Sequence, residues 1–258
     1  MIKNEYKEII NAAIAGGKVA SKYFGKILEL EGKSMPADFR TKADLEAEKV
    51  IIEILEKKFP NYNILSEEVG EINKNSEYTF VIDPLDGTNN FALGVPYFST
   101  SIALMNKDEV VFGVIYNPIL KNIYYAEKGK GAYLNKNRIY VSKESNLKKS
   151  TVSMVVNYGF PVDNFIRILD GLYRADVKRV TEFWSVAMDY CLLASGKIEA
   201  LILHTVPLYD FAAGKIIARE AGAMITDFNG QKEMNDKNDI FLTSNGTKIH
   251  QEILNILK

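Results

Sequence analysis

The segment VIDPLDGTNNF, residues 81–91, constrains the fold of this chain more than any other. Asp-Pro and Asp-Gly are turn dipeptides, so a turn is expected here. Val81 and Ile82 carry a buried strand up to this turn, which leaves two carboxylates, Asp83 and Asp86, three residues apart where the strand ends. The segment therefore predicts either an ordinary turn or a turn that presents two carboxylates to a metal ion.

The composition is that of a globular protein and narrows the choice of partners. Of the 258 residues, 47% are apolar and 25% are charged, and the formal net charge is -1. Acidic and basic residues are interleaved, so no basic face for nucleic acid is expected. No apolar run reaches the roughly 18 residues that span a membrane, and residues 1–25 have the spacing of an amphipathic helix rather than of a signal peptide. These patterns predict a cytoplasmic protein that binds neither nucleic acid nor membrane.

The periodicity of apolar residues divides the chain into two halves. Helical spacing predicts helices over residues 3–28 and 42–59, and strands are expected at residues 79–83, 97–105, 110–116 and 123–126. From Thr151 the two kinds of element alternate, with strands at 151–156 and 200–204 and helices at 162–174, 185–194 and 211–221. This order predicts an α/β protein with one domain over residues 1–258. Its N-terminal helices and mostly antiparallel sheet (1–145) would meet an α/β half (146–258) at the polar segment 143–150.

Side chains that bind soft metals are scarce in this sequence. The single cysteine, Cys191, lies in an apolar run, which favours a buried structural thiol and excludes an internal disulfide. Two histidines, His204 and His250, are too few for a histidine-rich zinc centre. Any metal ion is therefore expected to bind through oxygen atoms.

Further carboxylates stand at the ends of the expected elements. Glu67 and Glu68 end a strand-like segment and could be a solvated pair. Asp44 stands three residues after Thr41 and could complete a capping box, and Asp210 could be the N-cap of the helix that follows it. Magnesium, however, takes hard oxygen ligands, and a site for it needs several carboxylates from separate parts of the chain. Considered together, these residues indicate a magnesium site.

The residues after the two aspartates suit a phosphate group. Gly87 and Thr88 would expose N–H groups and a hydroxyl, as phosphate-binding turns do. After Asp210, the small residues 212–214 leave a helix N-terminus that a charged ligand could approach. Metal and phosphate would then meet at one place.

The segment DPLDGTNNF, residues 83–91, resembles the signature of the inositol monophosphatase and fructose-1,6-bisphosphatase superfamily of magnesium-dependent, lithium-sensitive phosphatases. Three more segments are similar in order and spacing: GKSMPADFRTKAD (32–44) to the mobile loop, SEEVG (66–70) to the Glu-Glu segment, and YDFAAG (209–214) to the Trp-Asp-x-Ala-Ala-Gly segment. The resemblance spans residues 5–228. It implies a five-layered α/β/α/β/α sandwich that is usually a homodimer.

The resemblance also implies a set of metal ligands. Glu67, Asp83 and the Leu85 carbonyl would bind a first Mg²⁺, and Asp83, Asp86 and Asp210 a second. Glu67 would support a third, weaker ion through water. Two to three ions per site are therefore expected, with Mn²⁺ as a substitute.

The remaining roles follow from the same resemblance. Thr88, paired with Asp44, would orient or deprotonate the attacking water, and Lys33 would lie near the metals. The N–H groups of Gly87 and Thr88 would hold phosphate oxygens, and Asp86 and Ser185 are also assigned to substrate binding.

Three positions depart from the pattern of the superfamily. Tyr209 replaces the usual Trp, which keeps a large aromatic residue there. Leu203 stands where inositol-specific members place a glutamate that binds ring hydroxyls, with His204 beside it, and Trp184 takes the place of a glycine. Trp184 is interpreted as a packing residue rather than a ligand platform. The part that hydrolyses phosphate is thus intact, and the part that recognises the sugar differs.

The substrate is therefore expected to be a small sugar or polyol phosphate, with inositol 1-phosphate first and fructose 1,6-bisphosphate next. Histidinol phosphate and adenosine 3',5'-bisphosphate stay open, as does a catalytically silent metal-binding protein. A cysteine phosphatase needs Arg where Lys197 follows Cys191, and the haloacid-dehalogenase type needs aspartates two residues apart. Both of these chemistries are excluded.

Overall fold

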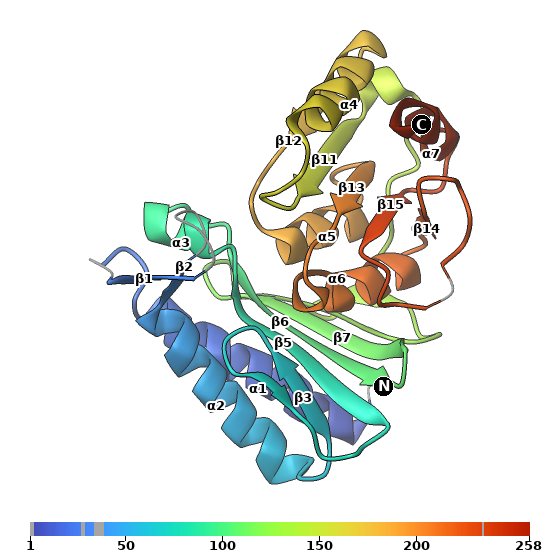
Figure 1. Ribbon diagram of the computed structural model, residues 1–258. Coiled ribbons are helices and arrows are strands. Elements are labelled where there is room, and N and C mark those ends of the chain that lie inside the picture. Colours follow the sequence, from blue (N-terminus) through green and yellow to red (C-terminus); the bar gives the residue numbers. More distant parts are fainter. Residues whose placement is uncertain (1–2, 27–28, 34–38, 234) are drawn as a thin grey trace.

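The computed structural model describes residues 3–26, 29–33, 39–233 and 235–258. Its elements form five layers in the order helices, sheet, helices, sheet, helices (Figure 1). The helices are α1 (Asn4–Ser21), α2 (Lys42–Lys58), α3 (Thr88–Leu93), α4 (Val162–Arg174), α5 (Val186–Ala194), α6 (Leu208–Glu220) and α7 (Ile249–Leu257), with a 3-10 turn at Leu147–Lys149.

Three sheets are present in the described residues. A hairpin pairs β1 (Leu30–Gly32) with β2 (Phe39–Thr41). The eight-stranded sheet has the order β10-β9-β8-β7-β6-β5-β3-β4, and the five-stranded sheet has the order β12-β11-β13-β15-β14. The strands of the larger sheet are β3 (Asn63–Ser66), β4 (Gly70–Ile72), β5 (Tyr78–Asp86), β6 (Ser99–Asn106), β7 (Glu109–Asn117), β8 (Asn122–Glu127), β9 (Ala132–Leu134) and β10 (Asn137–Ile139). Those of the smaller are β11 (Thr151–Val156), β12 (Arg179–Thr181), β13 (Ala200–His204), β14 (Met224–Thr226) and β15 (Ile240–Ser244).

Helices α1 and α2 cover one face of the eight-stranded sheet (Figure 1). Their apolar faces pack against alternate residues of the central strands, because side chains two apart on a strand point to the same face. Phe80 and Ile82 of β5 contribute to this core, whereas Val81 between them faces the opposite layer.

Helices α5 and α6 form the middle layer between the two sheets (Figure 1). Gly113 of β7 permits the close approach of α6, since a Cβ atom there would lie 2.8 Å from the Ala213 carbonyl oxygen. Likewise a Cβ atom on Gly214 would lie 2.4 Å from the Tyr190 ring, so glycine allows α5 and α6 to touch. These contacts fix the N-terminus of α6 above the larger sheet.

The five-stranded sheet buries both of its faces. Along β13, Leu201 and Leu203 pack on the middle helices, and Ala200 and Ile202 pack on the layer of α4 and α7. Strands β11, β12 and β13 are parallel, so their C-terminal ends lie at one edge of the sheet. That edge carries the loops that follow Val156, Thr181 and His204.

The observed layers confirm the predicted five-layered α/β fold. The helix at 162–174 and the strands at 151–156 and 200–204 were predicted with their observed bounds. The first helix ends at Ser21 rather than at residue 28, and a turn follows that contains Gly25 with a φ of 76°. Eight strands (β1, β2, β4, β9, β10, β12, β14, β15) and the helices α3 and α7 were not predicted.

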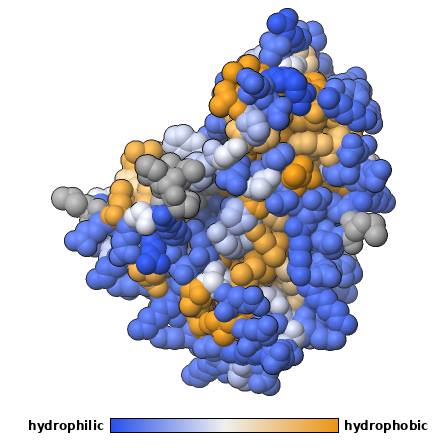
Figure 2. Space-filling view, in the orientation of Figure 1, coloured by the Kyte–Doolittle hydropathy of each residue, from blue (hydrophilic) through white to orange (hydrophobic). Residues whose placement is uncertain are grey.

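The face shown in Figure 2 is mostly hydrophilic, with apolar side chains over α3 and α4 and also in the centre and lower centre of the view. Among the described residues, no helix combines the length and the apolar character that a membrane span needs.

Candidate active site

The two aspartates of the DPLD segment lie on a bulged strand rather than on a turn. Strand β5 continues to Asp86, where the prediction ended it at Asp83. Asp83 pairs with Ser101 and Asp86 with Ser99, so three steps along β5 match two steps along β6. This extra residue is a β-bulge, and it places both carboxylates on the same side of the sheet because Ser99 and Ser101 are two residues apart.

Four carboxylates form an acid cluster at this end of the sheet: Glu67, Asp83, Asp86 and Asp210. Glu67 follows β3, whose parallel pairing with β5 sets Ser66 opposite Ile82 and so brings Glu67 beside Asp83. Asp83 and Asp86 are buried, and Glu67 and Asp210 are half-buried. The structure therefore brings together the four acidic residues that the sequence analysis singled out as ligands.

The environment of the acid cluster opposes negative charge. Burial raises the pKa of Asp83 and Asp210 well above the usual value, and repulsion from Glu67 and Asp86 raises both further. Burial also raises the pKa of Asp86, to about 6, although hydrogen bonds from Ser185 and Ser99 lower it. A side-chain hydrogen bond joins Glu67 to Asp83.

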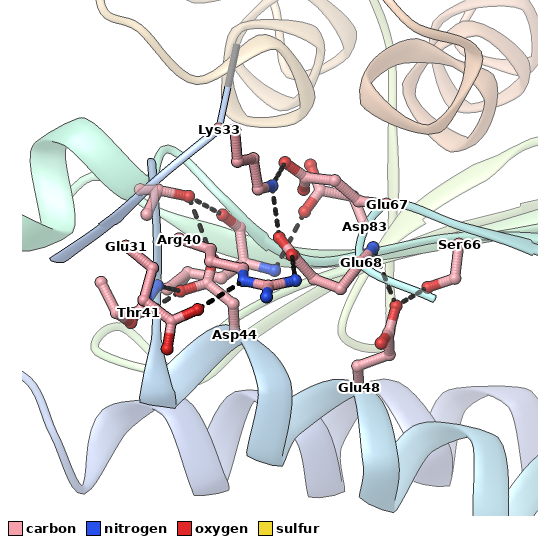
Figure 3. A network of polar contacts seen from close by, with 12 residues as sticks. Glu31, Lys33, Arg40, Thr41, Asp44, Glu48, Ser66, Glu67, Glu68 and Asp83 are labelled. Atoms are coloured by element: carbon pink, nitrogen blue, oxygen red, sulfur yellow. Dashed lines mark hydrogen bonds and ion pairs between the residues drawn. The ribbon is translucent and has the colours of Figure 1, made fainter. Parts of the chain in front are cut away.

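Lys33, next to strand β1, places a positive charge beside the acid cluster (Figure 3). Its Nζ lies 2.9 Å from Glu67 Oε1 and also contacts Glu68, which Arg40 Nη1 approaches to 3.4 Å. Burial alone would lower the pKa of Lys33, but Glu67 and Glu68 raise it well above its usual value, so the ammonium stays charged. As the side chains stand, no three His, Cys, Asp or Glu residues of the described segments are arranged to hold a metal ion. Residues 34–38 of the expected mobile loop lie outside the described residues.

Asp44 has both of the roles that its sequence position allowed. Its Oδ2 accepts from the Thr41 backbone N–H at 2.8 Å, and Thr41 completes a capping box at the start of α2. Its Oδ1 lies 3.2 Å from Thr88 Oγ1, which also lies 2.9 Å from the Leu85 carbonyl oxygen. Burial raises the pKa of Asp44 to about 7, despite the hydrogen bonds from Thr41. The predicted Thr88–Asp44 pair is thus present.

Gly87 turns the chain between Asp86 and helix α3. Its φ is 89°, in the left-handed region that favours glycine. A Cβ atom would lie 3.0 Å from the Tyr97 carbonyl oxygen and 3.1 Å from Ser185 Cβ. Both the conformation and the space therefore require glycine at this position.

Ser185 lies at the N-terminus of α5 and points at Asp86. Its hydroxyl donates to the Asp86 carboxylate, and the backbone N–H of Ala187 donates to the same group. Ser185 is 1% exposed. It orients Asp86, and its predicted contact with substrate stays a prediction.

Asp210 does not cap its helix. Helix α6 begins at Leu208 with Pro207 as the N-cap, so the N-cap interpretation of Asp210 is wrong. Proline suits this start because its φ is fixed at a helix-compatible value, and Asp210 falls in the first turn, where the helix dipole favours a negative charge.

Sequence reasoning missed Glu48, which holds the segment that carries Glu67 and Glu68 (Figure 3). Its Oε1 accepts from Ser66 Oγ and from the backbone N–H groups of Glu68 at 3.0 Å and Val69 at 3.1 Å. Glu48 lies four residues after Asp44 on the buried face of α2. Two acidic residues at this helical spacing among buried positions were the signal that could have found it.

The positions that depart from the superfamily pattern differ in exposure. Leu203 is fully buried against the middle layer. Trp184 is 57% exposed and has a φ of 55°, so its interpretation as a packing residue is wrong. His204 lies between the rings of Phe160 and Phe228, with centroid distances of 4.6 and 6.1 Å.

The five layers and the acid cluster beside a glycine turn define a phosphatase of the inositol monophosphatase and fructose-1,6-bisphosphatase type. The sequence profile described as the inositol monophosphatase family matches residues 2–258, and the chain belongs to that family. It is an enzyme that hydrolyses phosphoric monoesters, in a family that is generally metal-dependent.

Individual relatives agree over nearly the whole length. The chain is 34% identical to the inositol-1-monophosphatase of Mesorhizobium japonicum, over 90% of this chain and 88% of that protein. It is also 34% identical to the fructose-1,6-bisphosphatase/inositol-1-monophosphatase of Thermotoga maritima, over 91% and 88%. The crystal structure of the extragenic suppressor protein suhB from Bartonella henselae superposes with a TM-score of 0.91 at 32% identity, covering 98% of each chain.

Proposed function

We propose that this protein is a magnesium-dependent phosphatase of small sugar or polyol phosphates, with inositol 1-phosphate as the first candidate and fructose 1,6-bisphosphate as the second. The observation that carries the proposal is the meeting of four carboxylates with the Gly87–Thr88 turn at one end of the larger sheet. The names of the Mesorhizobium and Thermotoga relatives support this choice of substrates.

The donor atoms of the acid cluster have the chemistry that divalent cations such as Mg²⁺ prefer. Buried carboxylates that raise one another's pKa are stabilised by a nearby positive charge, and Mg²⁺ prefers carboxylate and carbonyl oxygen ligands. Glu67, Asp83, Asp86, Asp210 and the Leu85 carbonyl would hold two to three such ions, with Mn²⁺ as a substitute. Bound ions of this kind lower the pKa of water and neutralise charge on phosphoryl oxygens.

The chain itself supplies positioning and proton transfer. Thr88 Oγ1 would orient the attacking water, and Asp44, with a pKa of about 7, can accept a proton through Thr88 near neutral pH. The N–H groups of Gly87 and Thr88 would hold phosphate oxygens. In the overall reaction the water oxygen bonds to phosphorus, the ester P–O bond breaks, and the released alcohol takes up a proton.

Phosphate release from four compounds with Mg²⁺ tests the proposal: inositol 1-phosphate, fructose 1,6-bisphosphate, histidinol phosphate and adenosine 3',5'-bisphosphate. We expect the highest kcat/KM for one of the first two and no release when EDTA removes the metal. Asp86→Asn serves as the inactive control. Failure to release phosphate from any of the four, by a folded protein that binds Mg²⁺ in calorimetry, would favour the silent metal-binding alternative instead.

The assembly and inhibitor sensitivity are part of the same proposal. Light scattering is expected to give the mass of a homodimer, and lithium is expected to lower turnover.

A further inference from the structure

Asp189 is a buried carboxyl group that has no part in the proposed proton transfer or metal binding. It is the one charged residue of α5, and its side chain is fully buried in the middle layer. Burial raises the pKa of Asp189 to about 7, although hydrogen bonds from Ser153 and Tyr97 lower it. Taking a carboxyl group out of water costs free energy, and residues that break the apolar pattern of a core are expected at functional or strained sites. Packing alone therefore does not explain Asp189.

Two hydroxyl groups from different layers donate to Asp189. The Tyr97 hydroxyl donates to Oδ1 at 2.7 Å, and Ser153 Oγ donates to Oδ2 at 2.5 Å. Tyr97 lies just before β6 of the larger sheet, and Ser153 belongs to β11 of the smaller sheet. Both carboxylate oxygens are thus used, and this one group joins α5 to each of the two sheets.

Toward Asp86, Asp189 fixes the first turn of α5. The Asp189 backbone N–H donates to the Ser185 carbonyl oxygen at 3.0 Å, so the two residues share one helical turn. The same turn supplies the Ser185 hydroxyl and the Ala187 backbone N–H, which both donate to the Asp86 carboxylate. Because hydroxyl groups hold Asp189 on both of its oxygens, they also fix the place from which this turn contacts Asp86.

Toward Gly87, Asp189 acts through Tyr97. The Tyr97 carbonyl oxygen accepts from Asn90 Nδ2 at 2.9 Å, and a Cβ atom on Gly87 would lie 3.0 Å from the same oxygen. The Tyr97 backbone therefore lies directly against the Gly87 turn and the helix α3 that follows it. A shift of Tyr97 would move the N–H groups to which the proposed function assigns the phosphate.

We propose that Asp189 is a positioning residue of the candidate active site, whose carboxyl group sets the Asp86 carboxylate and the Gly87 turn in place relative to each other. The inference rests on the proposed function, because this placement matters only if Asp86 binds metal and Gly87 binds phosphate. Side chains that orient metal ligands through hydrogen bonds typically contribute about 10-fold to 100-fold in metal affinity or activity. Loss of the Asp189 carboxyl group is expected to have an effect of that size.

Asp189→Ala and Glu199→Ala form a matched pair of variants. Glu199 is also buried, and its carboxylate accepts from the Thr151 N–H at 2.8 Å, at the start of the same strand β11. Each variant loses a carboxylate that holds β11, so similar losses of stability are expected. Calorimetry with Mg²⁺, and then with inorganic phosphate at saturating Mg²⁺, is expected to show both affinities about 10-fold to 100-fold weaker in Asp189→Ala and unchanged in Glu199→Ala. Each variant is measured well below its unfolding transition.

Two conservative variants sharpen the test. In Asp189→Asn the amide oxygen can accept from one hydroxyl and the NH₂ group can donate to the other, so most of the lost affinity is expected to return. Tyr97→Phe keeps the ring and removes only the hydroxyl, so it is expected to fold even if Asp189→Ala does not. Because Tyr97 lies against Gly87, this variant is expected to weaken phosphate binding more than Mg²⁺ binding.

The outcomes separate the two proposals. Affinities that stay unchanged in Asp189→Ala and Tyr97→Phe while stability falls would make Asp189 a structural residue and overturn the inference. Equal losses of affinity in Glu199→Ala would also overturn it, since any loosening of β11 would then suffice. If the wild type binds neither Mg²⁺ nor phosphate, the proposed function fails and the inference falls with it, which is seen before any variant is compared.

Discussion

The two sides of the candidate active site are built in different ways. The side around Asp83, Asp86 and Gly87 consists of buried groups whose positions follow from strand pairing and a bulge. The side around Tyr158 and Trp184 consists of exposed rings on loops after β11 and β12. The comparison teaches that the carboxylates are positioned by the backbone of the core, whereas the rings on the other side stand on loops whose side chains can change without disturbing that core.

The largest expected effect is the difference in lost kcat between a variant of the acid cluster and a variant of Lys33 beside it. Asp86→Asn is expected to lower kcat at least about 1000-fold, because a carboxylate charge proposed to bind metal is lost at the centre of a buried cluster. Lys33→Ala is expected to lower kcat only about 10-fold to 100-fold. Its side chain is 22% exposed, and its ammonium adds positive charge at the margin of the acid cluster rather than at its centre. Steady-state kinetics with saturating Mg²⁺ measures both. Comparable losses in the two variants would remove the distinction between the buried core and its surroundings.

The next effect concerns the backbone at the two ends of α3. Gly87→Ala is expected to destabilise the protein by about 3 kcal/mol, because strain at a φ of 89° adds to the close contact with Tyr97. Gly94→Ala is the matched control, with a φ of 75° and open space around the added Cβ atom, and about 1 kcal/mol is expected. Urea unfolding measures both values, and an equal loss would show that the contact with Tyr97 is easily relieved.

Glu48 is not a member of the acid cluster, so replacing it tests whether its hydrogen bonds to residues 66–69 stabilise the cluster. Glu48→Gln keeps one acceptor but loses the charge that three donors share, so a loss of about 1 to 2 kcal/mol is expected, together with a weaker apparent affinity for Mg²⁺. Glu53→Gln alters an exposed residue of the same helix and is expected to change neither quantity. Calorimetric unfolding and Mg²⁺ titration of activity provide the readouts. An unchanged Mg²⁺ titration would mean that Glu48 supports the fold but not the cluster.

The smallest expected effect lies on the opposite side of the site. Trp184→Gly is expected to raise the free energy of unfolding by about 1 kcal/mol, because glycine adopts the left-handed conformation without strain and little buried area is lost. Thermal unfolding of wild type and variant measures the gain. A loss of stability would indicate that the indole packs on the chain more than its exposure indicates.

The sequence predicted which residues form the acid cluster, but it did not predict the backbone geometry that positions them. Asp83 and Asp86 were placed on a turn because Asp-Pro and Asp-Gly favour turns, yet pairing with β6 extends the strand through them. Glu48 was missed because its partners, Ser66 to Val69, are about twenty residues away and local patterns do not encode such pairings. Trp184 was interpreted as a packing residue because indoles are usually buried, but exposure depends on loop geometry that periodicity does not contain.

Helix α2 links two parts of the candidate active site. Asp44 and Glu48 stand one helical turn apart, and each forms hydrogen bonds to a different segment. Asp44 bonds to Thr88, and Glu48 bonds to the segment from Ser66 to Val69. The helix therefore acts as a rigid spacer of about 6 Å between these two sets of contacts. Heat or denaturant that frays this helix should loosen metal affinity and water positioning in the same transition, before the sheet itself melts.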